Sequence, residues 1–374
     1  MNAENKERRP HNGGEDTDAD DGINFDEDDF DGDDNVPPTR DDDNAAPTGG
    51  TGATPTKDDD EDEILFYSDK STKSRAKPSG PSAPPPSPLL RSSDLLGGLR
   101  TDLVNRFNTA QGGGWTGGMR TDIPLIDKHL RGFNPATVNI LNAEPNCGKT
   151  TFANHLGYDV ATYKEQIAAM LYLSMENPPS DLMLKHVSRL SGWPMQDLLN
   201  GLVDPDDARL QKALLELSQV PLYYLQGSLQ MTPDVLIERT KEVQQEQGEG
   251  VGVLLVVDYL QLFAKCCGLG SQIDQLGMVL PQLRRVATET RASLLVIGSQ
   301  NRAANTSGSV GMFGGRGSGE IEYEADSIMV LSNEPPAEDG LLARRLRIVK
   351  NRFGEKDVEC TLHFLAETAH FAAY

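Results

Sequence analysis

The pattern of apolar positions changes at about residue 115, where short apolar runs begin to alternate with longer amphipathic stretches. The runs are TVNILNA (137–143), AAMLYLS (168–174), VGVLLVVD (251–258), ASLLVIGS (292–299), DSIMVLS (326–332) and LRIVK (346–350). Continuous apolar runs separated by helical segments are typical of strands that are buried on both faces. The pattern therefore predicts an α/β fold over residues 114–374, with a mostly parallel sheet flanked by helices.

One helix is predicted ahead of this region, over residues 93–113. Its large apolar residues recur at helical spacing, and they are Leu95, Leu96, Leu99, Leu103, Val104 and Phe107. Ser93 is a candidate N-cap, whereas Gly97 and Gly98 weaken the helical pattern. A helix so isolated along the chain needs a surface for its apolar stripe, and a neighbouring subunit is one candidate. We interpret this segment as a linker helix.

Residues 1–92 are rich in acidic residues and proline and contain few large apolar residues, which predicts a long disordered arm. The chain has a net charge of −22, and residues 1–63 hold 23 Asp and Glu against 5 Lys and Arg. The acidity therefore belongs to the arm and excludes little about what the rest of the chain binds. We interpret the arm as a solubilising tail, and the alternative is that it docks a protein partner.

No stretch approaches the roughly 18 apolar residues of a membrane span, and no apolar run near residue 1 resembles a signal peptide. The four cysteines have neither the spacing of a metal site nor the density of a disulfide scaffold. We therefore expect a cytoplasmic protein without a membrane partner.

A candidate phosphate loop connects the first predicted strand to a predicted helix over residues 150–164. The loop residues are Ala143, Glu144, Pro145, Asn146, Cys147, Gly148, Lys149, Thr150 and Thr151. Such a loop turns its backbone N–H groups toward a phosphate at the positive end of a helix. Gly148 lets the backbone approach the phosphate, Lys149 reaches the β- and γ-phosphates, and Thr150 ligates Mg²⁺. The alternative is a chance match within a strand–turn–helix unit.

Three further strand ends carry polar residues that suit nucleotide hydrolysis. Asp258 ends one apolar run and offers a carboxylate on the metal side of the site. Glu176 follows a second run, and Gln300 follows a third, where an amide can hydrogen-bond a γ-phosphate or its attacking water. Glu176 alone also fits the start of a helix. Because the carboxyl ends of parallel strands share one edge of a sheet, the three residues together with the loop indicate an active site.

The motifs AEPNCGKTTF, LYLSMEN, LLVVDYLQLF, VIGSQNR, GRGSGEIEYEADSIMVL and IVKNRFGE follow one another in this order. This set resembles the motor domain of DnaB-type hexameric replicative helicases, which has a RecA-like fold, over about residues 115–374. The resemblance implies an ATP-hydrolysing DNA helicase of DNA replication that uses ATP and Mg²⁺. It also implies a hexameric ring that acts on single-stranded DNA with 5′-to-3′ polarity.

The resemblance implies roles for individual residues of the nucleotide site. Lys149 and Thr150 hold phosphate and Mg²⁺, and Asp258 supports the metal. Glu176 activates water. Gln300 senses the γ-phosphate and links it to the loop that faces DNA.

Lys350 and Arg352, in the KNR motif, are implied to reach into the site of the neighbouring subunit, with Arg352 as the arginine finger. An arginine offers a planar, always-charged fork to the transferred phosphate, and a finger supplied by a neighbour makes turnover depend on assembly. Head-to-tail contacts of this kind close into rings. Outside this motif set, the same segment would be interpreted as a basic strand end on a solvated face.

Residues 301–320 form a long segment rich in Gly and Ser, and such loops are usually functional or disordered. In the family the matching loop lines the central channel and contacts the single strand, which needs only backbone N–H groups and a few basic residues. The predicted DNA-binding residues are Arg302, Arg316, Gly317 and Gly319. Gly317 replaces a glutamate of the family's contact segment.

The family normally carries a globular helical N-terminal domain, and here we expect the acidic arm in its place. A second function class therefore stays open: a RecA-like ATPase, similar in role to KaiC or RadA proteins, that acts as a partner-activated switch or loader. In that case turnover is indifferent to DNA. An ATPase that binds nucleotide without hydrolysing it is a third idea, and it conflicts with the joint presence of Lys149, Glu176, Asp258 and Arg352. The arm has a further alternative, occupation of the protein's own DNA channel.

Overall fold

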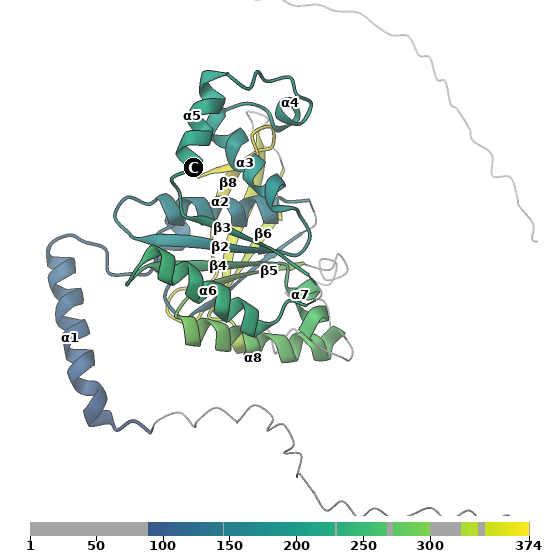
Figure 1. Ribbon diagram of the computed structural model, residues 1–374. Coiled ribbons are helices and arrows are strands. Elements are labelled where there is room, and N and C mark those ends of the chain that lie inside the picture. Colours follow the sequence, from purple (N-terminus) through teal and green to yellow (C-terminus); the bar gives the residue numbers. More distant parts are fainter. Residues whose placement is uncertain are drawn as a thin grey trace, which may run out of the picture. The chain divides into compact units, whose positions relative to one another are not determined.

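Nine strands form one sheet in the part of the chain that the computed structural model describes, in the order β3-β2-β4-β5-β1-β6-β7-β8-β9 (Figure 1). The strands are β1 Val138–Ala143, β2 Ala168–Ser174, β3 Leu222–Gln226, β4 Gly252–Asp258, β5 Ser293–Ser299, β6 Ser327–Asn333, β7 Leu342–Asn351, β8 Val358–Leu365 and β9 His370–Ala373. The pairings from β3 through β6 are parallel, whereas β7, β8 and β9 extend the sheet in antiparallel fashion. The prediction of a mostly parallel sheet is confirmed.

The structure describes residues 89–144, 146–228, 230–267, 272–299, 323–335 and 341–373. All of them belong to one structural unit, Ser87–Tyr374. The arm predicted over residues 1–92 lies outside the description except for residues 89–92. Pro145, Gln300 and the predicted DNA-binding segment, residues 301–320, lie outside it as well.

All six predicted apolar runs are strands. The runs of β1 and β2 are buried at every position, because helices cover both faces of the sheet there, whereas buried and half-buried positions alternate in the run of β7. The last run is longer than predicted, since β7 also includes residues 342–345, two of which are arginines, and Asn351. The strands β3, β8 and β9 were not predicted, and β3 and β8 consist mainly of half-buried residues. β3 is a short strand at the edge of the sheet, and β8 mixes polar with apolar residues, so neither has the long buried apolar run that identified the central strands.

Helices cover both faces of the sheet (Figure 1). The α-helices are α1 Ser92–Gln111, α2 Lys149–Thr162, α3 Pro179–Ser191, α4 Met195–Leu199, α5 Ala208–Leu217, α6 Pro233–Gln247, α7 Leu260–Cys267 and α8 Gln272–Thr290, and a short π-helix spans Ile126–Leu130. The helices α6, α7 and α8 pack on one face, and α2 packs on the other. The predicted helix after the loop is confirmed as α2.

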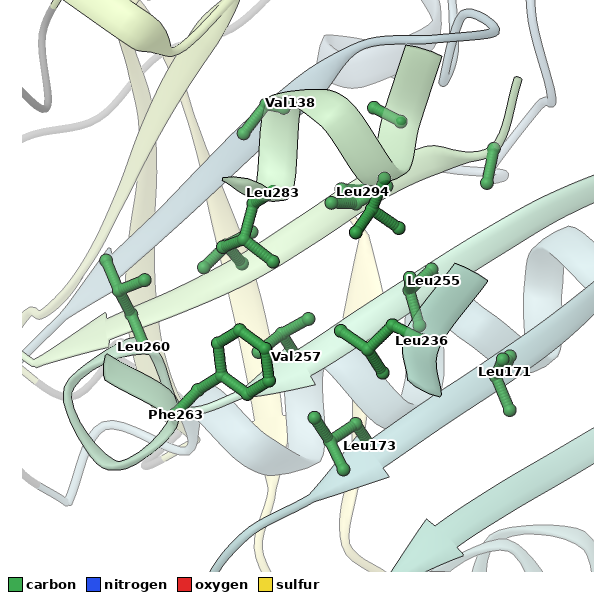
Figure 2. Packing of buried hydrophobic residues seen from close by; sticks show 14 of the residues in the cluster. Val138, Leu171, Leu173, Leu236, Leu255, Val257, Leu260, Phe263, Leu283 and Leu294 are labelled. Carbon is green, nitrogen blue, oxygen red and sulfur yellow. The ribbon is translucent and has the colours of Figure 1, made fainter. Parts of the chain in front are cut away.

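The core between the sheet and α6, α7 and α8 is made of aliphatic residues and one ring (Figure 2). Leu236 of α6, Phe263 of α7 and Leu283 of α8 are fully buried. They pack in the same cluster as Leu255 and Val257 of β4. Each such side chain contributes about 1.5–3 kcal/mol when it leaves water. This packing holds the end of β4, and therefore Asp258, in a fixed position.

The helix α1 has no buried residue. It begins at Ser92 with Arg91 as N-cap, so the prediction of Ser93 as the cap was wrong, although a helix does occupy most of residues 93–113. Its apolar stripe is exposed, and Phe107 has 62% of its surface accessible. An apolar stripe without a buried residue is consistent with a partner surface outside this chain.

Among the described residues, no helix combines the length and the apolar character that crossing a membrane requires.

Candidate active site

The predicted phosphate loop connects β1 to α2 as expected. Ala143 ends β1, and Gly148 precedes α2 with a backbone φ of 89°, a left-handed conformation that favours glycine. The first intrahelical bond runs from the Phe152 N–H to the Gly148 carbonyl at 2.8 Å, and no side chain caps the helix. The N–H groups of the first turn of α2 therefore have no intrahelical acceptor, which suits an anion.

Three contacts anchor the loop to β6. The Glu144 N–H and the Cys147 thiol both donate to the Leu331 carbonyl, each at 3.4 Å. The Asn333 side-chain amide donates to Glu144 at 3.1 Å. Burial raises the pKa of Cys147 to about 11, so this thiol stays protonated and acts as a packing group. Among the predicted loop residues, Asn146 is exposed and has a backbone φ of 64°.

Asp258, at the end of β4, is fully buried beside the loop. Its Oδ2 accepts a hydrogen bond of 2.7 Å from the Tyr172 hydroxyl, whereas its Oδ1 has no hydrogen-bond partner within the described ranges. Burial raises the pKa of Asp258, and the hydroxyls of Tyr172 and Thr150 and the charge of Lys149 oppose this rise. A buried carboxylate oxygen without a partner, next to a threonine hydroxyl, offers the hard oxygen ligands that Mg²⁺ prefers.

Glu176 lies in the connection between β2 and α3 and is exposed. Its segment is tied to the end of β4, because the Met175 N–H donates to the Asp258 carbonyl at 2.8 Å. The Ser174 hydroxyl donates to the Asn177 carbonyl at 2.6 Å and closes the turn around Glu176. The charge of Glu176 contributes to the raised pKa of Asp258, so the two carboxyl groups belong to one electrostatic site.

Lys149 lies at the start of α2 with its Nζ 5.2 Å from the centroid of the Tyr259 ring. No carboxylate of the described residues forms an ion pair with it. Thr150 and Thr151 follow in the first turn of α2, and Thr151 is buried. We call Ala143–Thr151 together with Glu176 and Asp258 the loop edge of the sheet.

A cavity of about 560 Å³ opens next to Thr151. Most of its lining is apolar and comes from α4 and from the turn between β8 and β9. The lining residues are Thr151, Lys185, Pro194, Met195, Gln196, Leu199, Phe364, Ala366, Glu367 and Ala369. The cavity therefore extends the loop edge with a space that accepts an apolar group.

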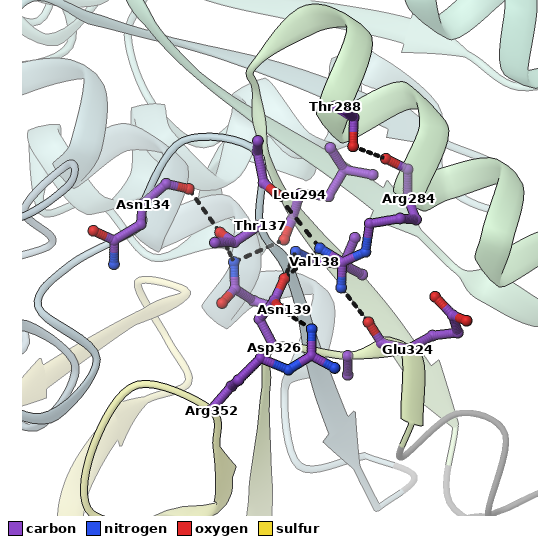
Figure 3. A network of polar contacts seen from close by, with 12 residues as sticks. Asn134, Thr137, Val138, Asn139, Arg284, Thr288, Leu294, Glu324, Asp326 and Arg352 are labelled. Atoms are coloured by element: carbon purple, nitrogen blue, oxygen red, sulfur yellow. Dashed lines mark hydrogen bonds and ion pairs between the residues drawn. The ribbon is translucent and has the colours of Figure 1, made fainter. Parts of the chain in front are cut away.

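Lys350 and Arg352 lie at the opposite edge of the sheet. Arg352 follows the end of β7, where its Nη1 binds Asp326 Oδ1 at 2.9 Å (Figure 3). Its Nη2 donates to the Tyr323 carbonyl at 2.8 Å. Asp326 Oδ2 also binds Arg284 and accepts from the N–H of Val138, the first residue of β1. Lys350 Nζ donates to the Ala325 carbonyl at 2.8 Å.

We call Arg284, Asp326, Lys350 and Arg352 the arginine edge. It adjoins the start of β1, whereas the phosphate loop follows the end of the same strand. The structure therefore brings Lys149, Thr150, Glu176 and Asp258 together at one edge of the sheet. It places Lys350 and Arg352 at the opposite edge.

The model of the DnaB-like helicase C terminal domain family matches residues 118–373. The chain belongs to this family. The replicative DNA helicase DnaB of Buchnera aphidicola subsp. Baizongia pistaciae is 27% identical over 242 residues, which cover 64% of this chain and 51% of that protein. The DnaB protein of Pasteurella multocida is 26% identical over 234 residues, covering 62% and 49%. The chain thus spans about half the length of these curated relatives.

A solved structure of a DnaB-like replicative helicase, described together with its interactions with primase, has the same fold with a TM-score of 0.62 at 17% identity. The alignment covers 75% of this chain and 71% of that one. The predicted RecA-like core and the DnaB resemblance are confirmed for this DnaB-like domain.

Four residues of this DnaB-like domain were not identified from the sequence: Tyr172, Arg284, Asp326 and Arg344. Tyr172 had a weak signal, because it is the one residue with a polar tip in the middle of a buried apolar run. Asp326 stands at the start of a predicted run, and its role depends on arginines 42 and 26 residues away. Arg344, which contacts the loop from β7, carries no local signal.

Proposed function

We propose that this chain is the motor of an ATP-hydrolysing DNA helicase that acts in DNA replication, on single-stranded DNA, as a ring of identical subunits. The observation that carries the proposal is the separation of the loop edge from Arg352. Within one chain, the six residues of β1 lie between them, about 20 Å at strand rise. Because Arg352 lies so far from the loop of its own chain, we infer that it serves a loop on another subunit.

The loop edge is proposed to bind ATP and Mg²⁺. Lys149 and the free N–H groups of α2 would bind the phosphates, and Thr150 and Asp258 would hold the cation, which offsets phosphate charge when bound. Glu176 is proposed to orient and activate the attacking water, and its exposure leaves it accessible to solvent.

The cavity next to Thr151 is proposed to receive the nucleoside. Its position directly beyond the loop and its mostly apolar lining favour a base over a further phosphate. Phe364 offers an aromatic ring at its wall.

The arginine edge is proposed to complete the loop edge of the neighbouring subunit. Arg352 would act as the arginine finger, and Lys350 would reach into the same site beside it. One face of each subunit then meets the opposite face of the next, and such head-to-tail contacts close into a ring. The family implies six subunits. The exposed apolar stripe of α1 is proposed to make a second contact with the neighbouring subunit. Residues 93–113 are proposed to be the linker helix.

Contact with single-stranded DNA is proposed for the segment that follows β5. Gln300 would link the nucleotide site to this segment, and the residues that would contact the DNA backbone are Arg302, Arg316, Gly317 and Gly319. Residues 1–92 are proposed to be an arm that precedes the ATPase domain, residues 114–374, in the sequence and acts as a solubilising tail, with docking of a protein partner as the alternative.

Steady-state ATP hydrolysis with and without single-stranded DNA tests this function. We expect wild type to be stimulated by DNA and Lys149→Ala to be inactive with or without it. Arg347→Ala is the control, because the Arg347 side chain is 40% exposed and pairs only with Asp357 among the described residues. If single-stranded DNA stimulates ATP hydrolysis, wild type should also displace one strand of a forked DNA duplex in a second assay. Turnover indifferent to DNA would overturn the helicase proposal and favour a partner-activated ATPase.

A further inference from the structure

Arg344 of β7 is a buried arginine whose guanidinium faces the phosphate loop from behind. Only 6% of its surface is accessible. Its Nε donates to the Cys147 carbonyl at 3.2 Å, and its Nη1 donates to the Ala343 carbonyl at 2.8 Å. Its guanidinium carbon lies 5.3 Å from the centroid of the Phe364 ring. Within the described ranges it forms no ion pair.

The other arginines of β7, unlike Arg344, form ion pairs with carboxylates. Arg345 pairs with Glu334, and Arg347 pairs with Asp357, and both side chains are 40% or more exposed. A buried cation without an anion is unfavourable, because neither water nor a carboxylate compensates its charge. Arg344 therefore places directly behind the loop a positive charge that contacts the Phe364 ring and has no ion-pair partner among the described residues.

Two aromatic rings complete this support. Phe364 of β8 and Phe371 of β9 stack with centroids 4.8 Å apart. A Cβ added to Gly148 would lie 3.1 Å from the tip of Phe371, so the loop rests on this ring. We call Arg344, Phe364 and Phe371 the loop floor.

The bond from Arg344 to Cys147 controls the direction of one peptide group. The Cys147 carbonyl and the Gly148 N–H belong to the same planar trans peptide and point in opposite directions. When Arg344 holds the carbonyl toward the floor, the Gly148 N–H is turned toward the inside of the loop. An N–H group so directed is available to a phosphate oxygen.

We propose that Arg344 is a positioning residue for nucleotide binding. It holds the Cys147–Gly148 peptide in the orientation that binds phosphate, and its charge strengthens the attraction of the loop for the phosphates of ATP. This inference rests on the proposed function, since it assumes that the loop binds ATP. It adds a residue of β7 to the nucleotide site of the same subunit.

Isothermal titration of the full chain with ATP and Mg²⁺, together with steady-state kinetics, tests the proposal. Arg344→Met keeps an apolar stem of similar length and removes both the charge and the donor. We expect its Kd and KM for ATP to rise about tenfold, with kcat at saturation changed less than about twofold. We expect Arg344→Lys, which keeps the charge, to recover most of the lost affinity. The matched control Arg345→Met loses the same charge from the same strand and should bind as wild type does.

Thermal unfolding of each variant without nucleotide separates a folding defect from a binding defect, because a purely structural role would lower the Tm and leave the Kd of the folded protein unchanged. If Arg344→Met does not fold, Arg344→Gln gives the same comparison with a smaller change. Unchanged ATP affinity in the folded variant, or equal weakening by Arg345→Met, would overturn the inference. Failure of folded wild type to bind ATP would instead overturn the proposed function.

Discussion

The loop edge and the arginine edge differ in whether their polar groups have partners within the described chain. At the loop edge, in the part of the chain that the structure describes, Lys149 has no ion pair and the buried Oδ1 atom of Asp258 has no hydrogen-bond partner. At the arginine edge, Asp326 is equally buried, but its two oxygens bind Arg284, Arg352 and the Val138 N–H. Two buried aspartates in one chain thus differ in whether the protein itself satisfies them.

This difference indicates that the loop edge, and not the arginine edge, is suited to bind a ligand. A buried polar group without a partner costs stability, so it persists where a ligand completes it. The arginine edge needs no ligand to be stable. Asp326 holds Arg352 in a defined place, and 47% of the Arg352 side chain is exposed. A residue that is oriented and still accessible is suited to meet another subunit.

The largest expected effect tests whether the two edges work on different subunits. Lys149→Ala and Arg352→Ala should each lower turnover by about 10³-fold, but only Lys149→Ala should lose ATP binding. Mixing the two inactive proteins should restore part of the activity, because some interfaces then combine an intact loop with an intact Arg352. ATP hydrolysis across mixing ratios is the measurement. A mixture as inactive as its components would show that the residues act within one chain.

The next effect concerns stability at the arginine edge. Asp326→Asn leaves Arg284 and Arg352 without their anion and should lower the free energy of unfolding by about 3 kcal/mol. Urea unfolding measures this change. Asp357→Asn removes the exposed partner of Arg347 and should stay within about 0.5 kcal/mol of wild type. Equal effects of the two substitutions would contradict the buried network at Asp326.

At the loop edge the corresponding substitution should have the opposite sign. Asp258→Asn keeps an oxygen acceptor for the Tyr172 hydroxyl and removes a carboxyl whose pKa burial has raised. We expect the nucleotide-free protein to gain about 1 kcal/mol at neutral pH, although ATP turnover falls by at least about 100-fold. Urea unfolding and ATP hydrolysis on one preparation check both signs. Destabilisation as large as that of Asp326→Asn would remove the contrast between the edges.

The smallest effect is the pH dependence of that gain. Because the folded pKa of Asp258 lies above its ordinary value of 3.8, the folded protein binds the proton more tightly than the unfolded chain does. Protonation therefore stabilises the fold, and this stabilisation is lost as pH rises through the folded pKa. The free energy of unfolding of wild type minus that of Asp258→Asn should fall from about pH 4 upward and then level off. A difference that rises with pH would mean that the pKa is lowered.

Much of the loop edge was predictable because its signals are local. The apolar run that became β1 ends next to the loop, and the runs that became β2 and β4 end next to Glu176 and Asp258. In a parallel sheet the carboxyl ends of strands meet at one edge, so order along the chain predicted proximity in space. The arginine edge and the loop floor were not predictable in this way. Arg344 lies 197 residues from Cys147, and no periodicity connects them.

The sequence by itself determined the parallel strands, the loop between β1 and α2, and the acids at the strand ends, because each depends on neighbours along the chain and on the period of burial. Only the tertiary structure decided that β7 returns antiparallel beside β6. That reversal carries Arg344 to the phosphate loop and Arg352 to the opposite edge. The same strand thereby carries Arg344 beside the proposed nucleotide site and Arg352 at the edge proposed to meet another subunit, because a strand's two ends lie as far apart as its length requires.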